Sequence, residues 1–259
     1  MLKAFLSRLL FKMKISKKTN VVPHKERDKK YGHKAFHVVN ITIFGAKQFP
    51  MLEEKIHVSV KKTARLVLLK SEVKKNSKLL IALHGYGQLS THFSKKFENI
   101  HPDFDVLIPE GLNRFYLKGS AGRVGSSWMT REERESDIAD NQNYLEQIFK
   151  DYSKKYTSIV LLGFSQGGAT ASRFCYQNTF NTSGLILWGS VFPPDISQVE
   201  RKQFFGKKYF VLGRQDEYFN PENQKEVLDL QTGLGYENVQ FVGGHDIDLA
   251  ILNEILNHF

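Results

Sequence analysis

The stretch IVLLGFSQGGATASRFC, residues 159–175, joins an apolar run to a helix-like segment through a serine between two glycines. Within it, residues 163–167 (GFSQG) match the pattern G-x-S-x-G, in which a strand, a sharp turn and a helix expose the serine hydroxyl. The N-terminus of the helix that follows also favours developing negative charge. We therefore predict that Ser165 is a nucleophile; the alternative is a serine that only fills a tight turn.

Apolar runs of strand length recur along the rest of the chain, and most are continuous, as in strands buried on both faces of a parallel sheet. The predicted strands are 56–60, 64–70, 78–83, 104–109, 158–163, 184–189, 207–213 and 238–243, the first two joined as a hairpin by residues 61–63. Helix-like stretches lie at 89–99, 132–155, 166–178, 221–232 and 246–258. This alternation predicts one α/β domain over residues 51–259, with a mostly parallel sheet of about eight strands and helices on both faces.

A nucleophilic serine needs a base and a carboxylate that orients it, and both follow the serine in chain order. His245, in VGGHDID after the last predicted strand, is the predicted base, because the other histidine after the serine, His258, is next to the chain end. The predicted acid is Asp216, in LGRQDEYFNP after the preceding strand. Glu217 and Asp195 are the alternatives, although Asp195 fits a helix cap better.

The reaction also needs N–H groups that hold an oxyanion. One comes from the residue after the nucleophile, Gln166, and the other from the loop after an earlier strand. The glycine-rich run His84-Gly85-Tyr86-Gly87 provides that loop, and Tyr86 is the predicted donor. His84 precedes the serine in the chain, so we expect it to have a structural hydrogen-bonding role rather than to be the base.

The segment 110–131 is rich in glycine, aromatic residues and arginine. As a mobile loop it would cover an acyl pocket, and its arginines would hold a carboxylate or phosphate. The alternative is an ordinary surface loop with Trp128 packed inward. We expect Trp128 to line the apolar pocket together with Trp188 and Phe192, which lie at the next strand exit.

HGYG, GFSQGG, the late aspartate loop and GGHD together resemble the phospholipase/carboxylesterase family of the α/β-hydrolase superfamily, which includes acyl-protein thioesterases and bacterial carboxylesterases. The resemblance covers about residues 51–259. It implies a serine hydrolase for carboxylic esters or thioesters, with no metal or organic cofactor, and assigns the catalytic triad to Ser165, Asp216 and His245. Gln88 stands where acyl-protein thioesterases usually have aspartate, which argues against an acyl-protein substrate.

The net charge of +10 is concentrated at the N-terminus. Residues 1–34 hold eleven lysines and arginines against two acidic residues, whereas the remaining chain has 26 basic and 25 acidic residues. A nearly neutral body excludes a nucleic-acid partner for it. The expected partner is a small-molecule or lipid-like ester substrate.

The N-terminal extension, residues 1–50, begins with a basic amphipathic pattern over 1–18, which favours contact with an anionic membrane surface; a solvated tail is the alternative. Arg8 and Lys12 interrupt the apolar run that a signal peptide would need. Cys175 is the single cysteine, so no intramolecular disulfide forms. These features predict a cytoplasmic protein with peripheral membrane contact. Acyl transfer or peptide cleavage on the same triad, or a noncatalytic binding role, are the rival functions.

Overall fold

The computed structural model describes residues 53–73, 77–177, 180–201 and 204–259. The extension 1–50, with its amphipathic pattern, lies outside these residues. The described residues from Thr63 onward belong to one compact unit, and residues 53–62 belong to another. None of the helices in the described part of the chain combines the length and apolar character that crossing a bilayer requires.

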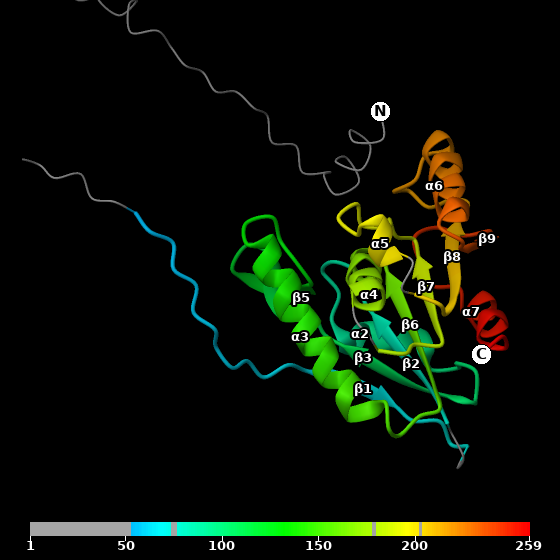
Figure 1. Ribbon diagram of the computed structural model, residues 1–259, viewed down its shortest axis with the longest axis horizontal. Coiled ribbons are helices and arrows are strands. Elements are labelled where there is room, and N and C mark those ends of the chain that lie inside the picture. The colour runs from blue at the N-terminus through cyan, green and yellow to red at the C-terminus, as the bar shows by residue number, and fades with distance from the viewer. Residues whose placement is uncertain (1–52, 74–76, 178–179, 202–203) are drawn as a thin grey trace, which may run out of the picture. The chain divides into compact units, whose positions relative to one another are not determined.

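A seven-stranded sheet forms the centre of the larger unit, in the order β1-β3-β2-β6-β7-β8-β9 (Figure 1). All neighbouring strands are parallel except β1, which pairs antiparallel with β3. The strands are β1 (Leu66–Leu69), β2 (Lys78–Leu83), β3 (Phe104–Pro109), β6 (Ser158–Phe164), β7 (Gly184–Trp188), β8 (Lys207–Gly213) and β9 (Glu237–Phe241). The central strands are buried along almost their whole length, which explains their continuous apolar sequence.

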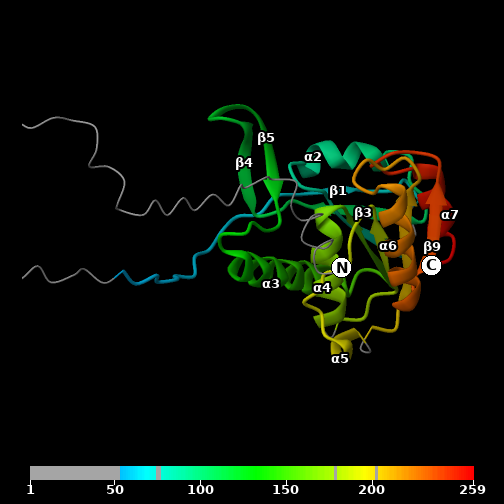
Figure 2. The same ribbon diagram turned by 90° about the horizontal axis from the view of Figure 1, so that it is seen from above.

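Helices cover both faces of the sheet, as predicted (Figure 2). One face packs against α3 (Arg134–Tyr152), α4 (Gln166–Gln177) and α6 (Pro221–Gly233). The other face packs against α2 (Ser90–Phe93), the 3-10 turn η1 (Ser94–Phe97) and α7 (Leu249–Leu256). A short helix, α5 (Gln198–Arg201), has no buried residues. The two buried clusters lie on either side of the sheet, so the unit is a three-layered α/β domain with a mostly parallel sheet, as predicted.

The prediction of a strand at 56–60 is wrong. The segment has no strand structure, and Ile56, Val58 and Val60 are 75–81% exposed. A strand needs a pairing partner as well as an alternating pattern, and this segment pairs with none of the strands in the described part of the chain. The sheet therefore has seven strands instead of eight, and the predicted hairpin through 61–63 does not form.

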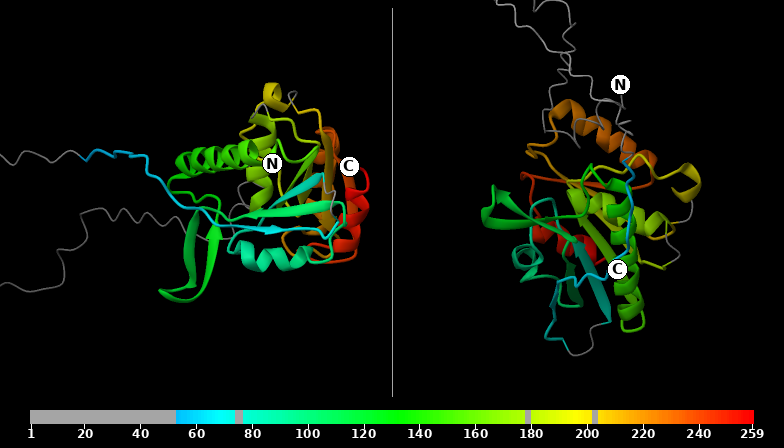
Figure 3. Two further views of the ribbon diagram at one scale, coloured as in Figure 1. Left: turned by 90° about the horizontal axis from the view of Figure 1, so that it is seen from below. Right: turned by 90° about the vertical axis from the view of Figure 1, so that its left-hand side faces the viewer.

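The segment 110–131 is a hairpin rather than a loop. Strands β4 (Asn113–Lys118) and β5 (Ala121–Ser127) pair antiparallel and form a separate two-stranded sheet. Gly119 and Gly122, with φ of +57° and +89°, allow the tight reversal between the strands. The hairpin projects from the body of the unit, as the views from two further directions show (Figure 3).

Candidate active site

Ser165 occupies the turn between β6 and α4 in a left-handed conformation, with φ of +53°. It is the one non-glycine residue with positive φ in the described part of the chain. A Cβ added to Gly167 would lie 2.4 Å from the backbone oxygen of Leu83, so only glycine lets α4 start this close to β2. The turn therefore has the strained geometry that exposes a serine hydroxyl.

His245 and Asp216 form a hydrogen-bonded pair in the loops that follow β9 and β8. The Nδ1 of His245 lies 2.7 Å from Oδ2 of Asp216, and the two side chains are 11% and 1% exposed. The N–H of Gln215 donates to the oxygen of Gly243 at 2.9 Å, which ties the two loops together. Because the carboxylate accepts from Nδ1, the other imidazole nitrogen, Nε2, remains available as a base.

Gly189 at the end of β7 links this pair to the serine. A Cβ at this position would lie 3.0 Å from Nδ1 of His245 and 3.2 Å from Oδ2 of Asp216. The residue before it, Trp188, accepts a hydrogen bond from the N–H of Ser165 at 2.9 Å. The exits of β6, β7, β8 and β9 therefore bring the three predicted triad residues to one edge of the sheet.

The alternative acids and the second histidine have other partners or positions. Asp195 accepts hydrogen bonds at 2.7 Å from Nε and Nη2 of the buried Arg173. Glu217 is exposed. His258 contacts the hydroxyl of Tyr209 through Nδ1 at 2.7 Å. These contacts favour Asp216 and His245, as the sequence predicts.

The loop after β2 lies against the serine. A Cβ on Gly85 would be 3.2 Å from Cβ of Ser165, so the backbone of this loop passes directly beside Ser165. The N–H groups of Tyr86 and Gln166 have no acceptor among the described residues. The next N–H, that of Gly87, donates to Ser126 of β5 at 2.8 Å and anchors the loop to the hairpin. Both predicted oxyanion donors are thus unsatisfied and close to Ser165.

The side chain of Gln166 joins the nucleophile turn to the segment after β5. Its Oε1 accepts from the N–H of Trp128 at 3.1 Å and from Ser127 Oγ at 3.2 Å. Its Nε2 donates to the oxygen of Met129 at 2.9 Å. No sequence pattern signals this role, because the glutamine is singled out only for its backbone.

His84 is completely buried and has the structural role that we predict. Its Nε2 accepts from the N–H of Gly111 at 3.0 Å, so Nδ1 carries the proton and donates to the oxygen of Gly85 at 2.7 Å. Burial lowers the pKa of His84 and favours this neutral form. The residue braces the loop after β2 against the segment after β3.

The three aromatic residues predicted to line a substrate pocket lie in the core instead. Trp128, Trp188 and Phe192 are at most 3% exposed. Each indole N–H is satisfied: Trp128 donates to the oxygen of His84, and Trp188 to the oxygen of Asp246, both at 2.8 Å. Their size and apolar character fit packing as well as binding, so composition alone does not separate the two roles.

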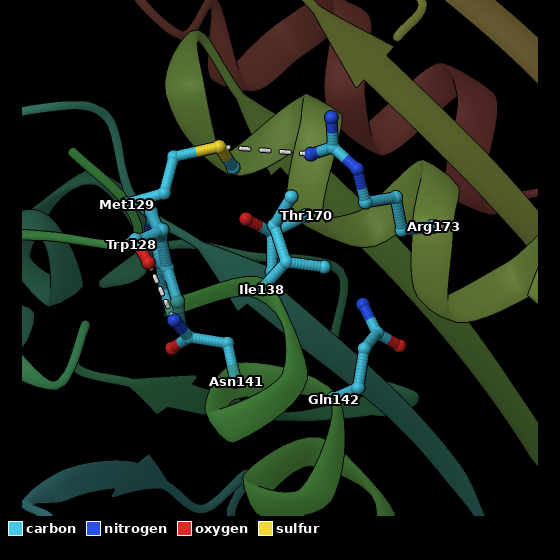
Figure 4. A pocket seen from close by; sticks show the side chains of 7 residues that line it. All are labelled: Trp128, Met129, Ile138, Asn141, Gln142, Thr170 and Arg173. Carbon is cyan, nitrogen blue, oxygen red and sulfur yellow. Dashed lines mark hydrogen bonds between the residues drawn. The ribbon is translucent and has the colours of Figure 1, made fainter. Parts of the chain in front are cut away.

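Trp128 also borders a small hollow between α3 and α4 (Figure 4). Its lining residues are Trp128, Met129, Ile138, Asn141, Gln142, Thr170 and Arg173. Neither Ser165 nor His245 borders it, so this hollow is not the predicted acyl pocket.

Exposed apolar side chains instead lie at the loop after β2 and on the neighbouring hairpin. Tyr86 is 56% exposed, and its ring contacts that of Phe115 on β4, with centroids 5.1 Å apart. Leu117, 37% exposed, lies over Gly87, where an added Cβ would be 3.1 Å from its Cδ2. The hairpin therefore offers an apolar surface beside the predicted oxyanion donors.

Glu110 is a buried hub that the sequence does not signal. Its carboxylate accepts from Arg65 Nη2 and Arg114 Nε, both at 2.6 Å, and from Ser90 Oγ at 3.0 Å. Burial alone would raise the pKa of Glu110, but the arginine and serine hydrogen bonds outweigh it and lower the pKa to about 2. The hub joins the ends of β1 and β3 to α2 and the hairpin.

A model of the phospholipase/carboxylesterase family matches residues 66–258, and the chain belongs to this family. The solved structure of esterase PE8 has a TM-score of 0.57 at 17% identity, covering 76% of this chain and 99% of that one. Acyl-protein thioesterase 2 of Zea mays has the same TM-score at 15% identity, covering 76% and 97%. The Bacillus cereus carboxylesterase has a TM-score of 0.52 at 16% identity, covering 75% and 92%. The chain thus has the α/β-hydrolase fold of these structures and belongs to the phospholipase/carboxylesterase family.

A curated relative from Oryza sativa subsp. japonica is named a probable 1-acylglycerol-3-phosphate O-acyltransferase. It is 27% identical over 116 residues, which are 44% of this chain. The match spans only 25% of the length of that relative.

Proposed function

We propose that the chain is a serine hydrolase that cleaves carboxylic esters through an acyl-enzyme, with Ser165, Asp216 and His245 as its triad. The observation that carries the proposal is the pairing of His245 with Asp216 at 2.7 Å on the same sheet edge as the strained Ser165. Membership of the phospholipase/carboxylesterase family supports the same chemistry.

In the first step, the hydroxyl oxygen of Ser165 attacks the acyl carbon while Nε2 of His245 takes its proton. The N–H groups of Tyr86 and Gln166 hold the negative charge that develops on the acyl oxygen. The imidazolium then gives its proton to the leaving alcohol, and the bond between the acyl carbon and the alcohol oxygen breaks. Water, deprotonated by His245, attacks the acyl-enzyme and releases the acid and the free serine.

The substrate class is an ester with an apolar acyl part. The exposed Tyr86 and Leu117, with the half-buried Phe115 that contacts Tyr86, form an apolar surface beside the oxyanion loop, where an acyl chain would lie. Thioesters and lysophospholipids fit the same description, and a panel of esters of increasing acyl length, with one thioester and one lysophospholipid added, distinguishes among them.

The test is hydrolysis of p-nitrophenyl esters by the full chain and by matched variants. We expect Ser165→Ala and Asp216→Asn to lower kcat by about four orders of magnitude or more. The control for Asp216→Asn is Glu217→Gln, which changes the adjacent exposed carboxylate and keeps full activity. Retention of most activity by Ser165→Ala would contradict the proposal.

The name of the rice relative raises acyl transfer as a second candidate. The same acyl-enzyme would then react with an alcohol instead of water, with no change in the triad. Product analysis in the presence of added glycerol or another alcohol separates the two: hydrolysis yields the free acid, whereas transfer yields a new ester.

A further inference from the structure

Two aromatic rings pack against the imidazole of His245. The ring of Phe164 lies 4.7 Å from it between centroids, at an interplanar angle of 38°. The ring of Tyr218 lies closer, at 4.5 Å and 58°. Neither contact follows from the sequence pattern of a triad.

The two rings differ in what else they contact. Phe164 is 2% exposed and also stacks on Phe93, so it belongs to the core of the unit. Tyr218 is 53% exposed and belongs to neither buried cluster. Its ring therefore contributes little to core burial, and core packing does not account for its contact with His245.

Tyr218 also contacts the carboxylate that orients the imidazole. Its backbone N–H donates to Oδ1 of Asp216 at 3.0 Å, while Oδ2 of the same carboxylate pairs with His245. One residue thus reaches both members of the pair, Asp216 through its backbone and His245 through its ring. Because a side-chain substitution preserves the backbone N–H, the two contacts can be tested separately.

We propose that Tyr218 is a positioning residue that acts through His245: its ring restricts the imidazole and stabilises the imidazolium formed in the reaction. A cation within about 6 Å of an aromatic ring is attracted by the ring. A ring against the imidazole also limits its rotation away from the serine. The role of Tyr218 in turnover rests on the proposed function, whereas its effect on the ring of His245 does not.

The test compares Tyr218→Ala and Tyr218→Phe in the full chain. We expect the alanine variant to lower kcat about two- to fivefold, with KM unchanged. The phenylalanine variant, which keeps the ring, should retain most of the activity. The control is Tyr116→Ala on β4, an equally exposed tyrosine (51%) that we expect to leave kcat and KM unchanged.

A rise in KM with kcat unchanged would overturn the proposal, because it would make Tyr218 a substrate contact. Equal losses in the alanine and phenylalanine variants would also overturn it, because the hydroxyl would then be the active group. Unchanged kcat and KM in Tyr218→Ala would overturn it as well.

A second measurement needs no turnover. NMR of the chain labelled at histidine ring carbons reports the motion of the His245 ring, and we expect this motion to increase in Tyr218→Ala but not in Tyr218→Phe. If the parent hydrolyses no ester but the ring motion changes as expected, the proposed function fails while the positioning role holds. Unchanged ring motion in Tyr218→Ala overturns the positioning role whatever the activity.

Discussion

Ser165 is held in a backbone conformation that serine rarely adopts, and the surrounding glycines let the chain close around it. Its φ of +53° lies in the left-handed region, which costs a residue with a side chain about 1–2 kcal/mol relative to the right-handed region. A strained conformation persists where the surrounding structure imposes it, as the contact between Gly167 and Leu83 does here. This conformation places the half-buried Ser165 at the turn between β6 and α4.

Two variants that both lack the hydroxyl measure this strain. We expect Ser165→Gly to be more stable than Ser165→Ala by about 1 kcal/mol, because glycine adopts positive φ without a Cβ clash. The greater backbone freedom of glycine in the unfolded chain reduces the difference but does not reverse it. Urea unfolding of both variants gives the two free energies. An alanine variant as stable as the glycine variant would argue against strain at this turn.

A substitution at Gly189 tests whether the packing around the His245–Asp216 pair affects turnover. Alanine at this position would place a Cβ 3.0 Å from His245 and add a side chain at a φ of +52°. We expect Gly189→Ala to displace the imidazole and lower kcat about 100-fold. Ester hydrolysis measures this change, with Gly233→Ala as the control, because an added Cβ there meets nothing within 4 Å. Unchanged kcat would show that the imidazole tolerates the displacement.

At the scale of elements, the strands were the most predictable part, because a short, continuous apolar run such as 78–83 is typical of a strand buried on both faces. The position of the candidate triad at the strand exits follows from the same reasoning. The sequence does not predict the hairpin β4–β5, since most of β4 is exposed and β5 begins exposed and contains two glycines. For residues 56–60 the sequence predicts a strand that does not form. The alternating pattern suits a strand, but pairing is decided by distant parts of the chain. The buried ring of Trp128 and the hub at Glu110 likewise depend on tertiary contacts that no local pattern encodes.

The lowered pKa of Glu110 predicts that the stability of the fold depends on pH. Its pKa of about 2 lies below the ordinary value of 4.5, so the folded protein binds this proton less readily than the unfolded chain does. The hub therefore stabilises the fold fully above about pH 4.5, and this contribution is lost as the pH falls through 2. We expect Glu110→Gln to lower the free energy of unfolding by about 2 kcal/mol at pH 7, since it removes charged hydrogen bonds.

The difference between parent and Glu110→Gln should then shrink steadily between pH 4.5 and pH 2. Denaturant unfolding at a series of pH values measures it. A difference that stays constant over this range would mean that the carboxylate of Glu110 does not stabilise the fold through its charge.

At the scale of the whole molecule, the charge is divided between a basic N-terminal extension and a nearly neutral body. Residues 1–18 have the pattern of a helix that lies on an anionic surface, and we propose that they bring the enzyme to lipid-like substrates. Replacing Leu6 and Leu9 with aspartate should lower flotation with anionic vesicles while leaving hydrolysis of a water-soluble ester unchanged. Equal flotation of the parent and the double variant would contradict this role.

The central claim is that Ser165 is the nucleophile, activated by the adjacent His245–Asp216 pair. Treating the folded full chain with a fluorophosphonate and measuring its intact mass tests this claim most directly. We predict that the parent gains one phosphonyl group, that peptide mapping places it on Ser165, and that Ser165→Ala gains none. Labelling of Ser165→Ala to the same extent as the parent, or no labelling of the folded parent, would contradict the account.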